Sequence, residues 1–320
     1  MEMSLYSCRK LATKFNCSKF CDGLRISKRH FASSNTSKAV CKEKPVSLAV
    51  GSSIGVISGF LGSLCGVGGS LVIIPALKQF SNVTIHRITG TSLAAVSGAS
   101  IFASVAYIEQ GFADIGIASL LGFSAMISSK FGAQMHMKLP KKSLTRMLGL
   151  FMLLSVPPLI MKQSNNSQQR TDIQQRKREG GLETPWKFYF GRRAPTLETF
   201  PVWLKDNAIY SVVGLATGFS TAMLGVGGGI IMKSVLGTFS PFTQHEAVAT
   251  SLCAMVPIGM SSAVWHFRAG NVKVRAAGLI GTTSALTMYC TAKYLAPHID
   301  EDTLRKIFAG LLTLSALKMF

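Results

Sequence analysis

Two short glycine-rich segments carry the residue types and spacing best suited to bind a ligand. The first spans 66–70 (GVGGS) and recurs 159 residues later at 225–229 (GVGGG). A helix that restarts at Ser70 or Gly229 would direct unpaired N–H groups and the positive end of its dipole into the interruption, which favours an anion. We therefore expect substrate contacts at these positions: Gly66, Gly68, Gly69, Ser70, Gly225, Gly227, Gly228 and Gly229. Close helix packing alone is the competing interpretation of the glycines.

Hydroxyl side chains follow each glycine segment at matching distances. Thr91 and Ser92 open the next apolar span of the first half, and Thr250 and Ser251 open its counterpart. These hydroxyls could donate to a carboxylate or sulfonate. They could equally cap the helix or bond to its own carbonyl groups, as Ser and Thr often do.

Three ionisable residues are candidates for coupling or gating. His86 and His245 occupy matched positions just before those spans, where a loop histidine is the simpler interpretation and a proton-linked role the alternative. Lys233 interrupts an apolar segment, and a charge inside a membrane indicates a functional site by default. Its counterpart in the first half is Ile74, so any such role is confined to one half.

Other kinds of chemistry have no matching pattern. No cluster with metal-ligand spacing and no Ser–His pair lies in register within the spans, so we expect neither an enzyme nor a cofactor or metal site. The phosphate-binding spacings of nucleotide sites are also missing. The seven cysteines show no zinc-like double pair and are interpreted as free thiols.

Composition indicates a membrane protein. The 320 residues are 48% hydrophobic and 15% charged, with a mean hydropathy of +0.34, whereas about a quarter of residues are charged in a typical soluble domain. Runs such as Ile88–Ile108 are about 20 residues long, enough to cross a bilayer. The net charge of +20 does not indicate nucleic-acid binding, because the basic residues lie in tails and in loops beside apolar spans.

The repeat divides the chain into four parts. These are a basic leader (1–44), a first transmembrane repeat (45–161), a polar and mostly disordered linker (162–207) and a second repeat (208–320). Each repeat begins with a glycine-broken stretch, at 45–80 and 208–239. Three spans follow in each, at about 88–108, 115–135 and 144–161, and then at 247–267, 274–296 and 303–320. We expect an all-α polytopic membrane protein.

Loop charges indicate that the two repeats are inverted. If each broken stretch is a hairpin that enters and returns, the short loops and C-terminus hold eight Lys and Arg on one side and only Lys293 on the other. The eight are Arg87, Lys138, Lys141, Lys142, Arg268, Lys273, Arg275 and Lys318. A single crossing by each stretch would divide the charges almost evenly and obey no orientation rule. The inverted model places both glycine breaks at one central site.

The leader offers two interpretations of location. Residues 1–44 hold ten Lys and Arg against three acids and lack an apolar signal-peptide core. An Arg- and Ser-rich, acid-poor leader is typical of a mitochondrial transit peptide, which predicts the mitochondrial inner membrane. A basic cytosolic tail that orients the first helix, for example in the plasma membrane, is the alternative.

These motifs resemble the sulfite exporter TauE/SafE family of membrane permeases over about residues 46–320, linker excluded. The likeness rests on the two glycine breaks, Pro75, the paired segments 90–95 (GTSLAA) and 249–254 (ATSLCA), and the Tyr107…Gly111 and His266…Gly270 ends. The resemblance implies transport of a small anion, such as sulfite or an organosulfonate, without a bound cofactor.

The sequence therefore predicts a secondary transporter that works by alternating access. Its partners would be the anion, the lipid bilayer and a coupling proton or other ion. The competing hypothesis is a non-transporting membrane scaffold or assembly protein that retains the fold. The sequence leaves open the anion, the direction of transport, the coupling ion and the oligomeric state.

Overall fold

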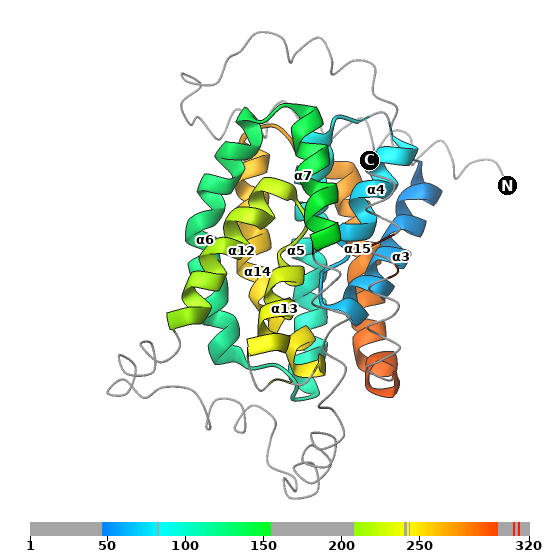
Figure 1. Ribbon diagram of the computed structural model, residues 1–320. Helices are drawn as coiled ribbons and strands as arrows, with labels where there is room; N and C mark the ends of the chain where they lie inside the picture. The colour runs from blue at the N-terminus through cyan, green and yellow to red at the C-terminus, as the bar shows by residue number, and fades with distance from the viewer. Residues whose placement is uncertain are drawn as a thin grey trace, which may run out of the picture. The chain divides into compact units, whose positions relative to one another are not determined.

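The computed structural model describes residues 47–81, 83–154, 208–239, 242, 244–299, 310 and 313. Within these residues the chain is helical and contains no strand, which confirms the expected all-α fold (Figure 1). The leader, the whole linker, the end of the span expected at 144–161 and most of the last expected span lie outside the described residues.

Within its described residues, the first half contains five helices that follow the expected plan. They are α3 (Leu48–Cys65), α4 (Ser70–Phe80), α5 (Ile85–Glu109), α6 (Ile115–Lys138) and α7 (Lys141–Leu154). Helix α3 ends and α4 begins on either side of the first glycine segment. The chain therefore breaks where the glycines predict.

The second half repeats this plan. Its elements are α12 (Ala208–Leu224), α13 (Gly229–Phe239), α14 (Gln244–Arg268), α15 (Val274–Cys290), a π-helical turn η2 (Thr291–Leu295) and a 3₁₀ turn η3 (Ala296–His298). The span expected at 274–296 is thus an α-helix that widens into a π turn near its end.

Four helices of the described part are long and apolar enough to cross a membrane. They are Leu48–Cys65, Ile85–Glu109, Ile115–Lys138 and His245–Arg268, and Ser70–Phe80 and Ala208–Leu224 are shorter apolar helices. Large apolar side chains also face outward on α6 and α15: Phe123 is 65% exposed, Ile127 67% and Leu286 68%. Such surfaces suit a lipid environment rather than water.

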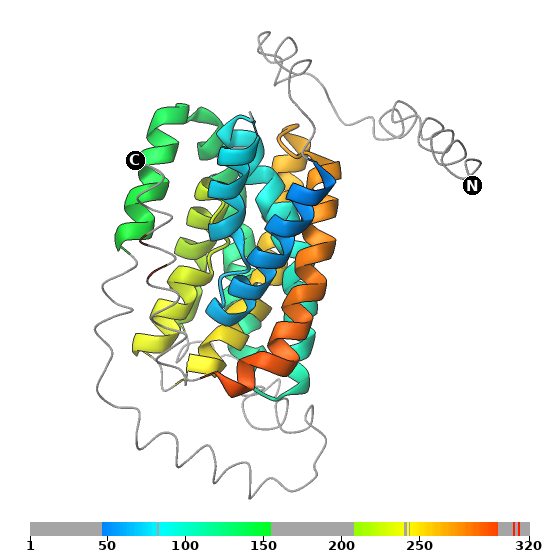
Figure 2. The ribbon, with the colours of Figure 1, turned by 90° about the vertical axis from the view of Figure 1, so that its right-hand side faces the viewer.

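The helices of one half pack mainly on those of the other. Helix α3 packs on α15, and its counterpart α12 packs on α6. Likewise α5 packs on α14 and α15, and α14 packs on α6. Each contact between two helices therefore has an equivalent contact between their counterparts in the other half. The short helices α4 and α13 lie toward opposite ends of the bundle in both views (Figures 1 and 2).

Glycines permit the closest of these helix contacts. A Cβ atom on Gly59 would lie 2.6 Å from the Ser284 carbonyl oxygen of α15, and one on Gly218 would lie 2.0 Å from the Ala125 carbonyl oxygen of α6. Gly59 and Gly218 are matched positions of the repeat. Close packing therefore explains helical glycines such as Gly59 and Gly218, leaving the break glycines to be explained separately.

Candidate functional site

The two glycine breaks are left-handed turns between helices. In the first, Gly66, Gly68 and Gly69 have φ angles of 69°, 69° and 82°. In the second, Gly225, Gly227 and Gly228 have φ angles of 78°, 77° and 63°. Side chains with a Cβ rarely adopt these angles. The backbone of the breaks therefore requires glycine at these six positions.

The two breaks touch each other. The Ser70 hydroxyl donates a hydrogen bond of 2.5 Å to the Val226 carbonyl oxygen. A Cβ atom on Gly229 would lie 2.2 Å from the Gly66 carbonyl oxygen, so no larger residue fits there without movement. The structure thus brings the predicted glycines and Ser70 together in one cluster, formed by both halves.

Ser92 and Ser251 connect the halves reciprocally. The Ser251 hydroxyl donates to the Gly66 carbonyl oxygen at 3.0 Å, and the Ser92 hydroxyl donates to the Gly225 carbonyl oxygen at 3.4 Å. Each hydroxyl also bonds within its own helix, to Val248 and Thr89 respectively. In this conformation both hydroxyl protons are directed to carbonyl groups, as the back-bonding interpretation allows.

Thr91 and Thr250 form a second reciprocal pair. The Lys273 N–H donates to the Thr91 hydroxyl oxygen at 3.1 Å, and the Asp114 N–H donates to the Thr250 hydroxyl oxygen at 3.1 Å. Lys273 and Asp114 are the N-cap residues of α15 and α6. These threonines therefore hold the start of a helix in the other half.

The three ionisable candidates have different surroundings. Lys233 lies on α13 and is only 3% exposed. His86 and His245 lie in the first turns of α5 and α14, so the expectation that they occupy loops was wrong: both helices start earlier than predicted. The His86 ring contacts His136, whereas the His245 ring lies 5.8 Å from that of Phe112.

Two buried histidines were missed by the sequence analysis. His136 Nδ1 lies 2.6 Å from the Met223 carbonyl oxygen, and His266 Nε2 lies 2.9 Å from the Ala222 carbonyl oxygen. Both carbonyls belong to the last turn of α12. In the first half, the Tyr107 hydroxyl donates to Ser63 at 3.0 Å, and these are the positions that match His266 and Ala222. The repeat match between Tyr107 and His266 was the sequence signal that could have identified His266.

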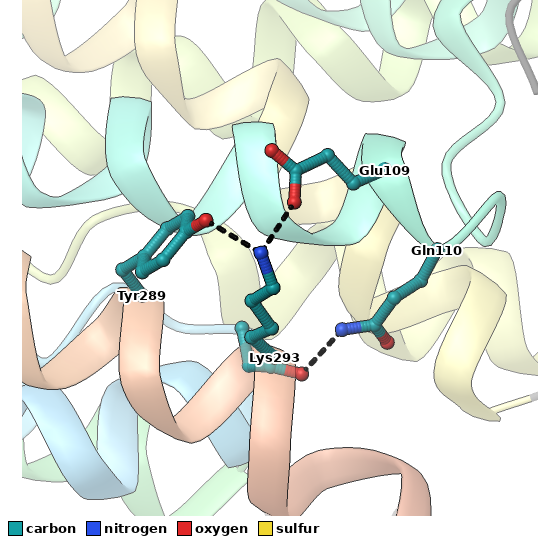
Figure 3. Close-up of polar contacts among 5 residues, drawn as sticks. Glu109, Gln110, Tyr289 and Lys293 are labelled. Carbon is teal, nitrogen blue, oxygen red and sulfur yellow. Dashed lines mark hydrogen bonds and ion pairs between the residues drawn. The ribbon is translucent and has the colours of Figure 1, made fainter.

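A polar cluster joins the halves where α5 ends (Figure 3). The Lys293 ammonium lies 3.2 Å from the Glu109 carboxylate and 3.0 Å from the Tyr289 hydroxyl. The Gln110 amide donates to the Ala292 carbonyl oxygen at 2.7 Å, inside the π turn. Lys293 had been considered only as a loop charge.

Metal binding finds no support in the described part of the chain. No group of three His, Cys, Asp or Glu side chains there could hold a metal ion, and the histidine rings meet edge to face instead of converging on one point. The described cysteines, Cys65, Cys253 and Cys290, are free thiols.

Comparison with known proteins identifies one family over most of the chain. The family model described as sulfite exporter TauE/SafE matches residues 51–319. No solved structure gives a significant match.

Curated relatives carry the name of probable membrane transporter protein. One from Bacillus subtilis, YunE, is 25% identical over 226 residues, covering 68% of this chain and 78% of that protein. One from Methanocaldococcus jannaschii is 34% identical over 116 residues, covering 31% of this chain and 43% of that protein. One from Haemophilus influenzae is 27% identical over 115 residues, covering 34% of this chain and 43% of that protein.

Proposed function

Because the chain belongs to the sulfite exporter TauE/SafE family and is an integral, multi-pass membrane protein, we propose that it is a secondary transporter of a small anion, such as sulfite or an organosulfonate. The observation that carries this proposal is the contact between the two glycine breaks. Both are built on backbone that only glycine readily adopts, and they meet within one cluster.

The chemistry around the breaks suits an anion. Helices α4 and α13 both begin at this cluster, and the first N–H groups of a helix carry partial positive charge. The Lys233 ammonium adds a buried positive charge on α13, within electrostatic range of Cys65 at the end of α3. The anion would bind at the predicted glycines and Ser70. Ser92 and Ser251 would contribute if their hydroxyls turn away from the carbonyl groups, and Thr91 and Thr250 would line the approach.

We propose alternating access because the two halves make the same hydrogen bonds to each other. Each half bonds to the glycine break of the other through the same pair of positions, Ser92 to Gly225 and Ser251 to Gly66. We propose that the halves are inverted repeats, which can exchange conformations and thereby open the site to either side in turn. The positions of α4 and α13 at opposite ends of the bundle support this arrangement (Figure 1).

The experiment is anion flux into liposomes that contain the purified chain. We expect flux of sulfite or a sulfonate from a panel of anions, and a large loss in Gly68→Leu and Gly227→Leu. Gly278→Leu is the matched control, because nothing lies within 4 Å of a Cβ atom there. Absence of flux for every anion in folded protein would favour the non-transporting scaffold. Unchanged flux in both break variants would move the site elsewhere.

A charge-specific test uses Lys233. If this ammonium attracts the anion, Lys233→Met should raise the KM for the anion several-fold. Lys233→Arg retains the charge and should raise the KM less. Equal losses in the two variants would indicate that Lys233 serves packing or gating.

The proposed location rests on the composition of the leader. We propose the mitochondrial inner membrane, on the basis of the Arg- and Ser-rich, acid-poor composition of residues 1–44. A fusion of these residues to a fluorescent protein should enter mitochondria. A cytosolic or plasma-membrane signal would leave only an orienting role for the leader.

A further inference from the structure

Three histidine rings meet at the end of the bundle where α5 begins and α6 and α14 end. The His86 and His136 ring centroids lie 4.7 Å apart at an interplanar angle of 88°, and those of His136 and His266 lie 4.9 Å apart at 78°. His136 and His266 are completely buried. They come from α6 and α14, which pack on each other and on α12 (Figure 1).

Hydrogen bonds fix the tautomers of the two buried rings. A carbonyl oxygen can only accept, so His136 Nδ1 and His266 Nε2 must carry protons where they meet Met223 and Ala222. In a neutral imidazole the other nitrogen is then an acceptor. His136 Nε2 and His266 Nδ1 are both buried and have no hydrogen-bond partner among the described residues. Two basic lone pairs are therefore held in the interior, an arrangement that native proteins seldom leave without a purpose.

Burial disfavours a charge on the two rings, but one feature of the surroundings favours a positive charge. Ala222 and Met223 lie in the last turn of α12, and the carbonyl groups at a helix C-terminus carry partial negative charge. Carboxylates do not assist. In the described residues they are Glu109, Asp114 and Glu246, which lie at the opposite ends of α5, α6 and α14 from the rings.

Basic side chains account for the remaining charge on the elements that carry the rings or pack around them. They are Lys78 of α4, Arg87 of α5, Lys130 and Lys138 of α6, Lys141, Lys142 and Arg146 of α7, Lys233 of α13, Arg268 of α14, Lys273 at the N-cap of α15 and Arg275 of α15. His86 is the third imidazole facing the pair. The basic charges, together with the closeness of the rings, limit the pair to a single added proton, because like charges at short range oppose a second.

The end of α3, which matches the end of α12 in the repeat, offers a natural comparison without a basic nitrogen. Tyr107 makes the bond that His266 makes in the second half, and the position that matches His136 is Leu295. The carbonyl bond alone therefore does not require histidine. The second half has the same structural bond with an additional acceptor nitrogen beside it.

We propose that His136 and His266, with His86 against them, form a binding site for one proton. A proton from water would bond to His136 Nε2 or His266 Nδ1 and leave the pair with one positive charge. Met223 lies two residues before Gly225, so this charge would act directly on the second glycine break. Resting on the proposed function, the site would couple proton movement to movement of the anion.

The proton site is tested without transport by nuclear magnetic resonance of ¹⁵N-labelled histidine in the full chain, in lipid nanodiscs. We expect one of the two buried acceptor nitrogens to become protonated on acidification while the protein stays folded. His136→Asn and His266→Gln should abolish this event, because each amide keeps the donor to its carbonyl and removes the lone-pair nitrogen. His266→Tyr, which copies the first half, is a second variant at that position. Acceptor nitrogens that remain unprotonated until unfolding would overturn the proposal.

Coupling is tested by anion accumulation in liposomes under a proton gradient. The histidine variants should keep downhill anion flux and lose the accumulation that the gradient drives. His298→Gln is the control, because His298 is exposed and lies in η3, beyond the C-terminal end of α15. Gradient-driven accumulation that persists in both variants would overturn coupling at this site while leaving the transporter intact. No flux in the wild type would instead remove the proposed function, and the resonance experiment would still decide the proton site.

Discussion

At the scale of single residues, the site depends on hydrogen bonds exchanged between matched positions. Ser92 and Ser251 each bond to the first glycine of the other half's break, and Thr91 and Thr250 each hold the start of a helix in the other half. Such bonds satisfy backbone groups that a break leaves unpaired inside a membrane, where water is not available to replace them. The reciprocal pattern therefore explains how irregular backbone persists at this position.

These serines should contribute to stability as well as to function. Ser251→Ala removes the donor to the Gly66 carbonyl and should lower the free energy of unfolding by about 1 kcal/mol. Thermal unfolding of the purified chain measures this loss. Ser119→Ala is the matched control, because among the described residues its hydroxyl bonds only within its own helix, to Gly116. An equal loss of unfolding free energy in the two variants would show that the bond between halves adds no stability beyond a bond within one helix.

Residue types alone predicted part of this cluster. The break glycines and Ser70 were predicted because only glycine suits such turns, and they do lie together. His136 and His266 could not be found in the same way, since they lie 130 positions apart in the sequence and only folding brings their rings together. The start of α5 was placed too late because His86 was interpreted as a loop residue.

At the scale of helices, glycine faces determine which elements meet. Helix α12 approaches α6 at Gly218 as α3 approaches α15 at Gly59. The apolar runs predicted the helices through their length and hydropathy. The glycine segments predicted the breaks because their backbone takes positive φ angles. The partner of each helix could not be predicted, since α3 and α15 are separated by more than half of the chain.

Gly218 offers a direct test of this packing. A Cβ atom there would lie 2.0 Å from the Ala125 carbonyl oxygen, which belongs to the backbone and cannot turn aside. Gly218→Ala should therefore lower the free energy of unfolding by about 1–3 kcal/mol, as overpacking does. Gly98→Ala, where nothing lies within 4 Å, should leave it unchanged or raise it slightly. Equal thermal unfolding of the two variants would contradict the helix pairing.

At the scale of the whole molecule, charge separates the two ends of the bundle. Arg87, Lys138, Arg268 and Lys273 lie at the end where α5 starts and α6 and α14 finish. Glu109, Asp114 and Glu246 lie at the other end, with Lys293 bonded to Glu109. This division fits the inverted repeats that we propose, in which the basic end would face the cytosol or the mitochondrial matrix.

Accessibility of introduced cysteines tests that topology. Single cysteines at Lys141 and Lys273, in a background without native cysteines, should react with an impermeant reagent from the same side of the membrane. A cysteine at Asp114 should react from the opposite side. Labelling of Lys141→Cys and Lys273→Cys from different sides would reject the inverted arrangement.

The central claim is that the two breaks together form the transport site, and a matched pair of glycine variants tests it most directly. Gly229→Ala places a methyl group 2.2 Å from the Gly66 carbonyl oxygen of the other half, whereas Gly278→Ala meets nothing within 4 Å. The measurement is anion flux in liposomes at equal amounts of folded protein. The account predicts that Gly229→Ala lowers flux by at least an order of magnitude while Gly278→Ala transports like the wild type. Wild-type flux in Gly229→Ala would contradict it.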